Sequence, residues 1–210
     1  MRVIGITGGV GAGKSAVLKY LKAIPGVRVL EADQVGHLLM EPGTECFQRI
    51  REHFGERVIA EDGSLDRAAV ARIIFSDKKE LEWQNALMHP AIKEWIRQEL
   101  RQERQQGTCK LFVVEAALLI EDHYEDLCEV FWYLYTRPEL RRERLKESRG
   151  YSDEKIDSIF ARQRTDAEFR SHCREVIDNN GTKEELYGQI DLLLQKLEIK
   201  TDTKEKMLRN

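Results

Sequence analysis

The apolar residues of this chain gather in short runs that predict β-strands. The longest run is residues 130–135, and residues 2–7 and 111–114 form runs of the same kind. Apolar runs of this length between polar residues are typical of strands buried on both faces of a sheet. Two more strands are predicted at 27–32 and at 176–177, which gives five in all.

Helical spacing occurs between these strands. Residues 14–23 carry Val17 and Leu21 on one helix face, and residues 186–197 repeat the pattern near the other end of the chain. A strand, a helix and a second parallel strand are joined by a right-handed crossover. We therefore expect an α/β fold, with a parallel five-stranded sheet flanked by helices.

Two segments interrupt this alternation. Between residues 41 and 106 the only strand pattern is a weak one at 57–60, and three helices are predicted there, at 64–74, 78–87 and 91–105. About 60 helical residues are too many for an ordinary crossover, so we expect a helical subdomain inserted at the mouth of the sheet. The second segment, 137–174, is also helical and rich in arginine. Residues 200–210 are polar, and we expect them to be frayed.

Composition and charge narrow the class of protein. The 210 residues are 41% hydrophobic and 34% charged, and 34 Lys+Arg against 37 Asp+Glu give a net charge of −3. A general nucleic-acid binder would carry a basic excess, and no apolar run approaches the roughly 18 residues that span a bilayer. Glycines follow the N-terminus too early for a signal peptide. We therefore expect neither nucleic acid nor membrane among the partners.

The cysteines favour a reducing compartment. All four are scattered, with no Cys-x-x-Cys pair and no histidine at metal-ligand spacing: Cys46, Cys109, Cys128 and Cys173. Disulfides and structural zinc are therefore not expected, and the cytoplasm is the expected location.

Residues 8–15, Gly-Gly-Val-Gly-Ala-Gly-Lys-Ser, match the phosphate-binding pattern G-x-x-x-x-G-K-[ST]. Glycines let successive N–H groups point into one concavity that holds an anion, and the helix that follows adds its positive end. Lys14 supplies an ammonium for the β- and γ-phosphates, and Ser15 a hydroxyl for Mg²⁺. A chance glycine-rich turn is the alternative, but the position after a strand and before a helix favours a nucleoside triphosphate site.

The fate of the terminal phosphate is a separate question. The sequence lacks the N-K-x-D tetrapeptide that is typical of GTPases, and it is shorter than a large ATPase motor. These two observations favour a small kinase. Such a kinase needs a base near the acceptor hydroxyl. Asp33 ends the second predicted strand, at the sheet edge where the phosphate loop lies. An N-cap for a helix that starts at Gln34 is its alternative role.

The arginine-rich segment supplies candidate cations. Residues 137–174 hold 11 Lys+Arg and 8 Asp+Glu, a local charge of +3. Arg137, Arg141 and Arg144 have the spacing i, i+4, i+7 and share one helix face. Guanidinium groups on that face suit a phosphate clamp that closes over ATP. A solvated helix with its own glutamates is the alternative.

A series of landmarks follows this order along the whole chain. After the phosphate loop come Ala32-Asp33 with His37, His89-Pro90, Leu118-Leu119-Ile120-Glu121, the segment 141–144, Gln163, and Asp178-Asn179-Asn180-Gly181. In this order they resemble the dephospho-CoA kinases, over about residues 2–197. The resemblance implies ATP-dependent phosphorylation of the 3′-hydroxyl of dephospho-CoA, which gives CoA and ADP in the last step of coenzyme A biosynthesis.

The resemblance also implies a fold and a set of roles. It implies a P-loop sheet core (1–33, 108–136 and 175–200), a helical CoA subdomain (34–107), a lid (137–174) and a flexible tail (201–210). Asp33 would be the base, and Arg141 and Arg144 the lid cations. ATP phosphates would be held by Gly11, Ala12, Gly13, Lys14, Ser15 and Ala16. Asn179 would lie near adenine, and the dephospho-CoA side would include His89, Leu118 and Glu121.

Five positions depart from the family pattern as this resemblance implies it: Glu31, Lys93, Ala117, Arg141 and Ser148. Two other functions stay open on the sequence, a kinase for another small metabolite or nucleotide, and a nucleotide-binding switch protein. ATP and dephospho-CoA are the expected small-molecule partners, and the expected assembly is a monomer or a weak homo-oligomer.

Overall fold

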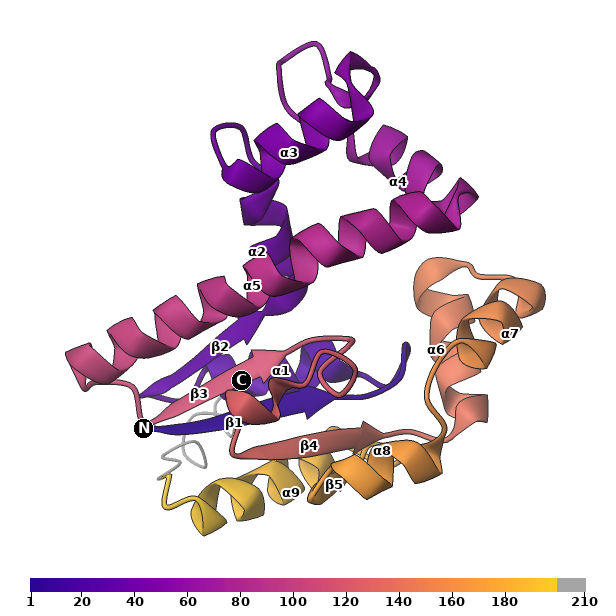
Figure 1. Ribbon diagram of the computed structural model, residues 1–210. Coiled ribbons are helices and arrows are strands. Elements are labelled where there is room, and N and C mark those ends of the chain that lie inside the picture. Colours follow the sequence, from indigo (N-terminus) through magenta and orange to yellow (C-terminus); the bar gives the residue numbers. More distant parts are fainter. Residues whose placement is uncertain (200–210) are drawn as a thin grey trace. The chain divides into compact units, whose positions relative to one another are not determined.

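The computed structural model describes residues 1–199 and contains the predicted five-stranded parallel sheet (Figure 1). The predicted tail at 201–210 lies outside the described residues. The strands have the order β2-β3-β1-β4-β5. Their bounds are β1 Arg2–Thr7, β2 Val27–Glu31, β3 Leu111–Glu115, β4 Val130–Tyr135 and β5 Glu175–Asp178. The central strand β1 pairs in parallel with both β3 and β4, so its carboxyl end is flanked by theirs.

One face of the sheet packs against the helices α1 (Lys14–Lys22) and α9 (Lys183–Lys196). Successive side chains of a strand point to opposite faces, and Ile4 with Ile6 of β1 and Trp132 with Leu134 of β4 belong to one buried cluster with α1 and α9. The two helices also meet through Tyr20 and Tyr187, whose rings stack at 4.2 Å. Burial of apolar side chains at this interface fixes the start of α1, which follows the phosphate loop.

The chain divides into two compact units, Met1–Leu30 with the chain from Glu103 onward, and Glu31–Gln102. The first unit holds the sheet together with α6 (Pro138–Arg149), α7 (Asp153–Ala161) and α8 (Asp166–His172). The second unit begins a few residues before residue 34 and ends a few residues before residue 107, the bounds of the predicted insertion. Separate domain status for the lid stays a prediction.

The helices α6 to α8 have clear end signals. α6 starts with Pro138 and ends at Gly150 with φ 61°, a left-handed conformation in which glycine is favoured. Ser152 caps α7 through the N–H of Lys155, and Thr165 forms a capping box with Glu168 at the start of α8. Polar caps therefore mark the starts of α7 and α8, and a proline marks the start of α6.

The second unit is helical, as predicted. Its elements are α2 Ala32–Leu39, α3 Glu45–Phe54, the 3₁₀ turn Glu56–Val58, α4 Arg67–Ser76 and most of α5 Lys78–Gln106. A separate apolar cluster that includes Phe47, Ile50 and Met88 forms its core. His53 stacks on Trp83 at 3.7 Å and lies 2.6 Å from Glu80, so polar contacts join α3 to α5 beside this core.

Two predictions for the second unit are wrong, that of a pair of helices and that of a weak strand. The helices predicted at 78–87 and 91–105 are one 29-residue helix, α5, with Pro90 inside it. An internal proline costs about 3 kcal/mol, but Leu87, Met88 and Ile96 are buried on both sides of it, and each is worth about 1.5–3 kcal/mol. The strand pattern at 57–60 gives a 3₁₀ turn and one isolated bridge, Ile59 to Leu65.

Candidate active site

The glycine-rich loop connects β1 to α1, as the motif predicts. Gly11 has φ 82° and Gly13 has φ 94°, a conformation that strains any residue with a Cβ atom. The N–H of Ala12 donates to the carbonyl of Gly9 at 3.1 Å, which closes the loop on itself. Lys14, Ser15 and Ala16 form the first turn of α1, so the positive end of the helix faces the loop.

Side chains from several elements bind the loop through its carbonyl groups. Lys14 Nζ donates to the carbonyl of Gly8 at 2.8 Å, and Glu115 Oε1 lies 3.6 Å from the same nitrogen. In a trans peptide the carbonyl of one residue and the N–H of the next point in opposite directions. A bound carbonyl therefore holds the next N–H group on the other side of the loop.

The carbonyl of Ala12 accepts three side-chain hydrogen bonds. Its donors are Thr136 Oγ1 at 3.0 Å, Asn179 Nδ2 at 2.7 Å and Arg144 Nη1 at 3.3 Å. Thr136 follows β4 and Asn179 follows β5, and both are buried. The ends of two strands and the helix α6 thus fix the peptide between Ala12 and Gly13.

Arg141 is held on the same loop by three different contacts. Its Nε donates to the carbonyl of Val10 at 2.9 Å, and its Nη2 donates to Gln163 Oε1. The guanidinium carbon lies 4.3 Å from the centre of the Phe160 ring, within the range of a cation–π contact. A methyl group on Gly9 would overlap the guanidinium, so glycine is needed there for close approach.

Neutral oxygen atoms surround both lid arginines. Arg144 Nη2 also donates to the carbonyl of Asn179 at 3.1 Å, and within residues 1–199 no carboxylate lies within ion-pair distance of Arg141 or Arg144. Burial lowers the pKa of Arg141, but arginine stays protonated in proteins. Burial and nearby Asp166 raise the pKa of Tyr133, which keeps this neighbouring phenol neutral. The positive charge of these two arginines is therefore not cancelled by a carboxylate.

The predicted residues on the acceptor side are divided between the two units. Leu118 and Glu121 lie in the first unit, between β3 and β4, and Leu118 is 39% exposed. Glu121 Oε1 pairs with Arg164 Nε at 2.5 Å. Asp33 and His89 lie in the second unit, on α2 and α5. The structure thus groups the loop, lid and strand-end residues, whereas Asp33 and His89 belong to a different body.

The predicted position of Asp33 is wrong in detail. α2 begins at Ala32, so Asp33 lies in the first helical turn and neither ends β2 nor caps the helix. Glu31 is the N-cap, in extended conformation. Ala32, Val35 and Gly36 are buried along one face of α2, and this face extends the helix two residues further toward β2 than predicted. Asp33 is exposed.

Asn179 has a different observed contact from the expected one. Its amide nitrogen binds the carbonyl of Ala12, so the side chain supports the phosphate loop. A place near adenine stays a prediction for this residue.

Three residues at the site were missed or left without a role. Thr136 directly follows a buried strand, and the convergence of the carboxyl ends of parallel strands is a signal that finds it. Gln163 was a landmark of the resemblance only, and Phe160 was not singled out. Neither has a sequence signal for contact with Arg141. Both lie at the end of α7 or just after it, and Gln163 is 22 residues from Arg141 in the sequence.

Ser15 fits one ligand position for magnesium. It is exposed in the first turn of α1, and Mg²⁺ in kinase sites takes few protein ligands and keeps waters and substrate phosphates. In the described residues no group of three or more His, Cys, Asp or Glu side chains forms a metal cage. A single hydroxyl beside the phosphate loop matches this kind of site.

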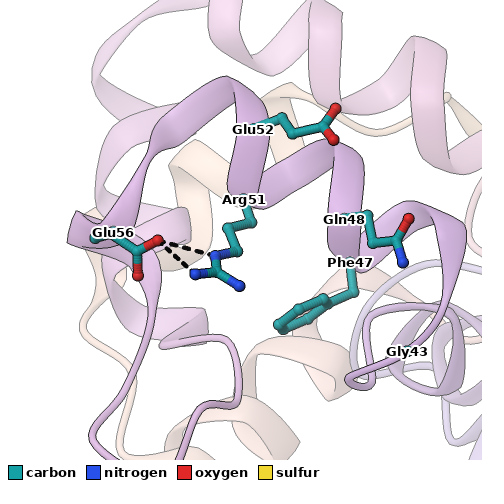
Figure 2. Close-up of a pocket in the computed structure, with 6 residues that line it drawn as sticks. All are labelled: Gly43, Phe47, Gln48, Arg51, Glu52 and Glu56. Atoms are coloured by element: carbon teal, nitrogen blue, oxygen red, sulfur yellow. Dashed lines mark hydrogen bonds and ion pairs between the residues drawn. The ribbon is translucent and has the colours of Figure 1, made fainter.

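The second unit contains a hollow of about 450 Å³, drawn in Figure 2. It is lined by Gly43, Phe47, Gln48, Arg51, Glu52 and Glu56. Arg51 donates two hydrogen bonds to Glu56 Oε1, at 2.9 and 2.7 Å, so its charge is compensated. None of the predicted site residues lines this hollow.

No helix in the described part of the chain is long and apolar enough to cross a membrane.

Comparison with known proteins identifies relatives over nearly the whole chain. The family model for dephospho-CoA kinase matches residues 2–185. A dephospho-CoA kinase from Streptococcus pneumoniae is 34% identical, over 92% of this chain and 95% of its own. One from Gloeobacter violaceus is 35% identical, over 94% of each.

Solved structures have the same fold. A crystal structure from Thermus thermophilus has a TM-score of 0.74 and 29% identity, over 93% of this chain and 97% of that one. A dephospho-CoA kinase structure from Campylobacter jejuni has a TM-score of 0.68 over 94% and 98% of the two chains. At 18% identity, this second likeness supports the fold alone.

Proposed function

This chain belongs to the dephospho-CoA kinase family, and from that premise we propose which of its residues perform the reaction. It transfers the γ-phosphoryl group of ATP to the 3′-hydroxyl of dephospho-CoA, which yields CoA and ADP. Phosphoryl transfer depends on positioning and on stabilisation of negative charge. The observation that carries our assignment is the phosphate loop, in which the carbonyl groups of Gly8, Val10 and Ala12 are each bound by a side chain.

The phosphates of ATP bind to the loop and to the start of α1. The carbonyls of Gly8, Val10 and Ala12 are each held by a side chain, so the N–H groups of the following residues face the opposite way. Residues 11–16 receive the β- and γ-phosphates on that side, with Lys14 as the mobile ammonium.

Arg141 and Arg144 act as the lid cations. A guanidinium has five N–H donors, and the contacts described above leave donors of both residues for phosphate oxygens. Their charge is held in place before ATP binds, and charge that is already oriented toward the transferring group is the larger part of this kind of catalysis.

Ser15 supplies a hydroxyl ligand for Mg²⁺. A bound Mg²⁺ would neutralise part of the negative charge of the phosphates. Lys14 and Ala16 flank Ser15 in the same first turn of α1.

Asp33 acts as the base that accepts the proton of the 3′-hydroxyl. His89, Leu118 and Glu121 lie on the dephospho-CoA side, and Asn179 on the adenine side of ATP. Support comes from the exposed carboxylate in the first turn of α2, directly after β2, together with the family membership.

Replacement of Asp33 tests this assignment. Asp33→Asn is expected to lower kcat by about 10²–10⁴, the usual contribution of a general base, and to leave ATP affinity within about twofold. Asp62→Asn, an exposed carboxylate of the same unit that bonds only Ser64, is the matched control. ADP release is measured with dephospho-CoA, AMP, CMP, dTMP and adenosine as acceptors. A rate for Asp33→Asn equal to that of the control removes Asp33 from the mechanism.

We also propose that the protein acts in the cytoplasm as a monomer or weak homo-oligomer. All four cysteines are buried and none of them forms a disulfide, which suits a reducing compartment. Sedimentation analysis tests the assembly.

A further inference from the structure

Gln163 lies in the turn between α7 and α8, and its side chain reaches Arg141 of α6. Its Oε1 accepts a hydrogen bond from Arg141 Nη2. The backbone N–H of Gln163 donates to the carbonyl of Phe160 at 3.2 Å, and the ring of Phe160 lies against the same guanidinium. One short turn therefore supplies both the edge contact and the face contact of Arg141.

Three contacts hold the guanidinium of Arg141 in one orientation. The carbonyl of Val10 holds Nε, Gln163 holds Nη2, and Phe160 covers one face of the plane. Glycine at position 9 provides the space for this packing. A long flexible side chain, which has large rotamer entropy in solution, is ordered before any ligand arrives.

Arg142, the next residue along α6, shows how a charged acceptor changes the electrostatic state of an arginine. Arg142 donates to Asp153 at 2.7 Å and also to Asp157, so two carboxylates compensate its charge. At Arg141 the corresponding acceptor is an amide oxygen, which bonds a guanidinium as a carboxylate does but carries no charge. The amide thus orients the cation and leaves its full charge for a ligand.

We propose that Gln163 is a positioning residue for phosphoryl transfer, which orients the Arg141 guanidinium on the phosphate loop without cancelling its charge. The inference rests on the proposed role of Arg141 as a lid cation. It explains why position 163 carries glutamine in particular. Alanine would lose the hydrogen bond to Arg141, and glutamate would keep the hydrogen bond but add a negative charge.

Two substitutions separate contact from charge. Gln163→Ala is expected to lower kcat about tenfold, the effect of a lost hydrogen bond to a charged group, with the KM for dephospho-CoA within about twofold. Gln163→Glu is expected to keep or raise the melting temperature, because it pairs with Arg141, and still to lower kcat about tenfold. Asp157→Asn, which removes a carboxylate from Arg142 on α7, is the matched lid control, with kcat within about twofold.

A double-mutant cycle with Arg141→Gln tests whether Gln163 acts through Arg141. In the Arg141→Gln background, Gln163→Ala is expected to change kcat by less than about twofold, since residues that act as one unit are not additive. Additive effects would overturn the proposal. A Gln163→Glu variant with wild-type kcat would also overturn it, because a purely structural contact tolerates the charge.

The same measurements distinguish the possible failures. Wild-type protein that forms no CoA contradicts the reaction itself. An Arg141→Gln variant with unchanged kcat contradicts the role of Arg141, and Gln163 then loses its proposed function with it. A large effect of Arg141→Gln beside wild-type rates for both Gln163 variants contradicts the positioning proposal alone.

Discussion

Two sides of α6 carry the same kind of side chain in opposite electrostatic states. The loop-facing side holds Arg141 and Arg144, which donate to backbone carbonyls and one amide. The carboxylate-paired side holds Arg142 and Lys146, which both bind Asp153. The residue type is nearly constant over two helical turns, but the acceptor changes from neutral to charged.

This difference is the one we expect between a cation that binds a ligand and a cation that joins two helices. A carboxylate partner offsets the charge of Arg142, so this side holds α6 and α7 together and offers little field to a ligand. Carbonyl and amide oxygens also bind Arg141 and Arg144, but they leave the charge of both residues uncompensated. The partner of an arginine, more than its place on a helix face, therefore indicates whether it serves phosphate chemistry.

The largest expected effect compares one arginine from each side. Arg144→Gln is expected to lower kcat by about 10²–10³, the loss seen when one oriented donor to a developing negative charge is removed. Arg142→Gln is expected to keep kcat within about twofold, because its charge is already paired at the surface. Steady-state kinetics with ATP and dephospho-CoA give both values. Equal losses in the two variants would mean that the whole lid, rather than the loop-facing side, supports the reaction.

A smaller effect is expected where the loop itself receives Arg141. Gly9→Ala places a methyl group on the guanidinium, and the flexible arginine is expected to move away while the loop keeps its fold. We expect kcat to fall about tenfold, as for loss of a hydrogen bond to a charged group. In the Arg141→Gln background the same change is expected to have less than about a twofold effect. A tenfold loss in that background would place the damage in the loop and would contradict the role of Arg141.

The loop-facing side also shows how far the sequence predicts the site. The loop, Lys14 and Ser15 follow from one motif, because its glycines and its place between a strand and a helix constrain the geometry strongly. The five strands are found close to their observed positions for a similar reason, since buried parallel strands are continuous apolar runs. These features are local in sequence.

The contacts that complete the site are not local. Val10 and Arg141 are 131 residues apart, and Ala12 and Asn179 are 167 apart, so no spacing rule joins them. The helical spacing of Arg141 and Arg144 predicted a shared face but not their acceptors, which decide their charge state. The predicted helices at 78–87 and 91–105 leave a gap around Pro90, because the burial that keeps α5 continuous there is not visible in the sequence.

The smallest expected effect concerns Asp153 on the carboxylate-paired side. Hydrogen bonds from Lys146 and then Arg142 lower the pKa of Asp153. A lowered folded-state pKa means that the stabilisation is present above the unfolded value of about 3.9 and is lost as the pH falls through the folded value. Asp153→Asn is therefore expected to lower the melting temperature by no more than about 4 °C between pH 5 and 8, with kcat within about twofold. The difference from wild type is expected to fall progressively as the pH drops below about 4, and to shrink in high salt, where exposed ion pairs are screened. Thermal denaturation at several pH values gives both trends, and a large loss of kcat in Asp153→Asn would show that the two sides of α6 are not independent.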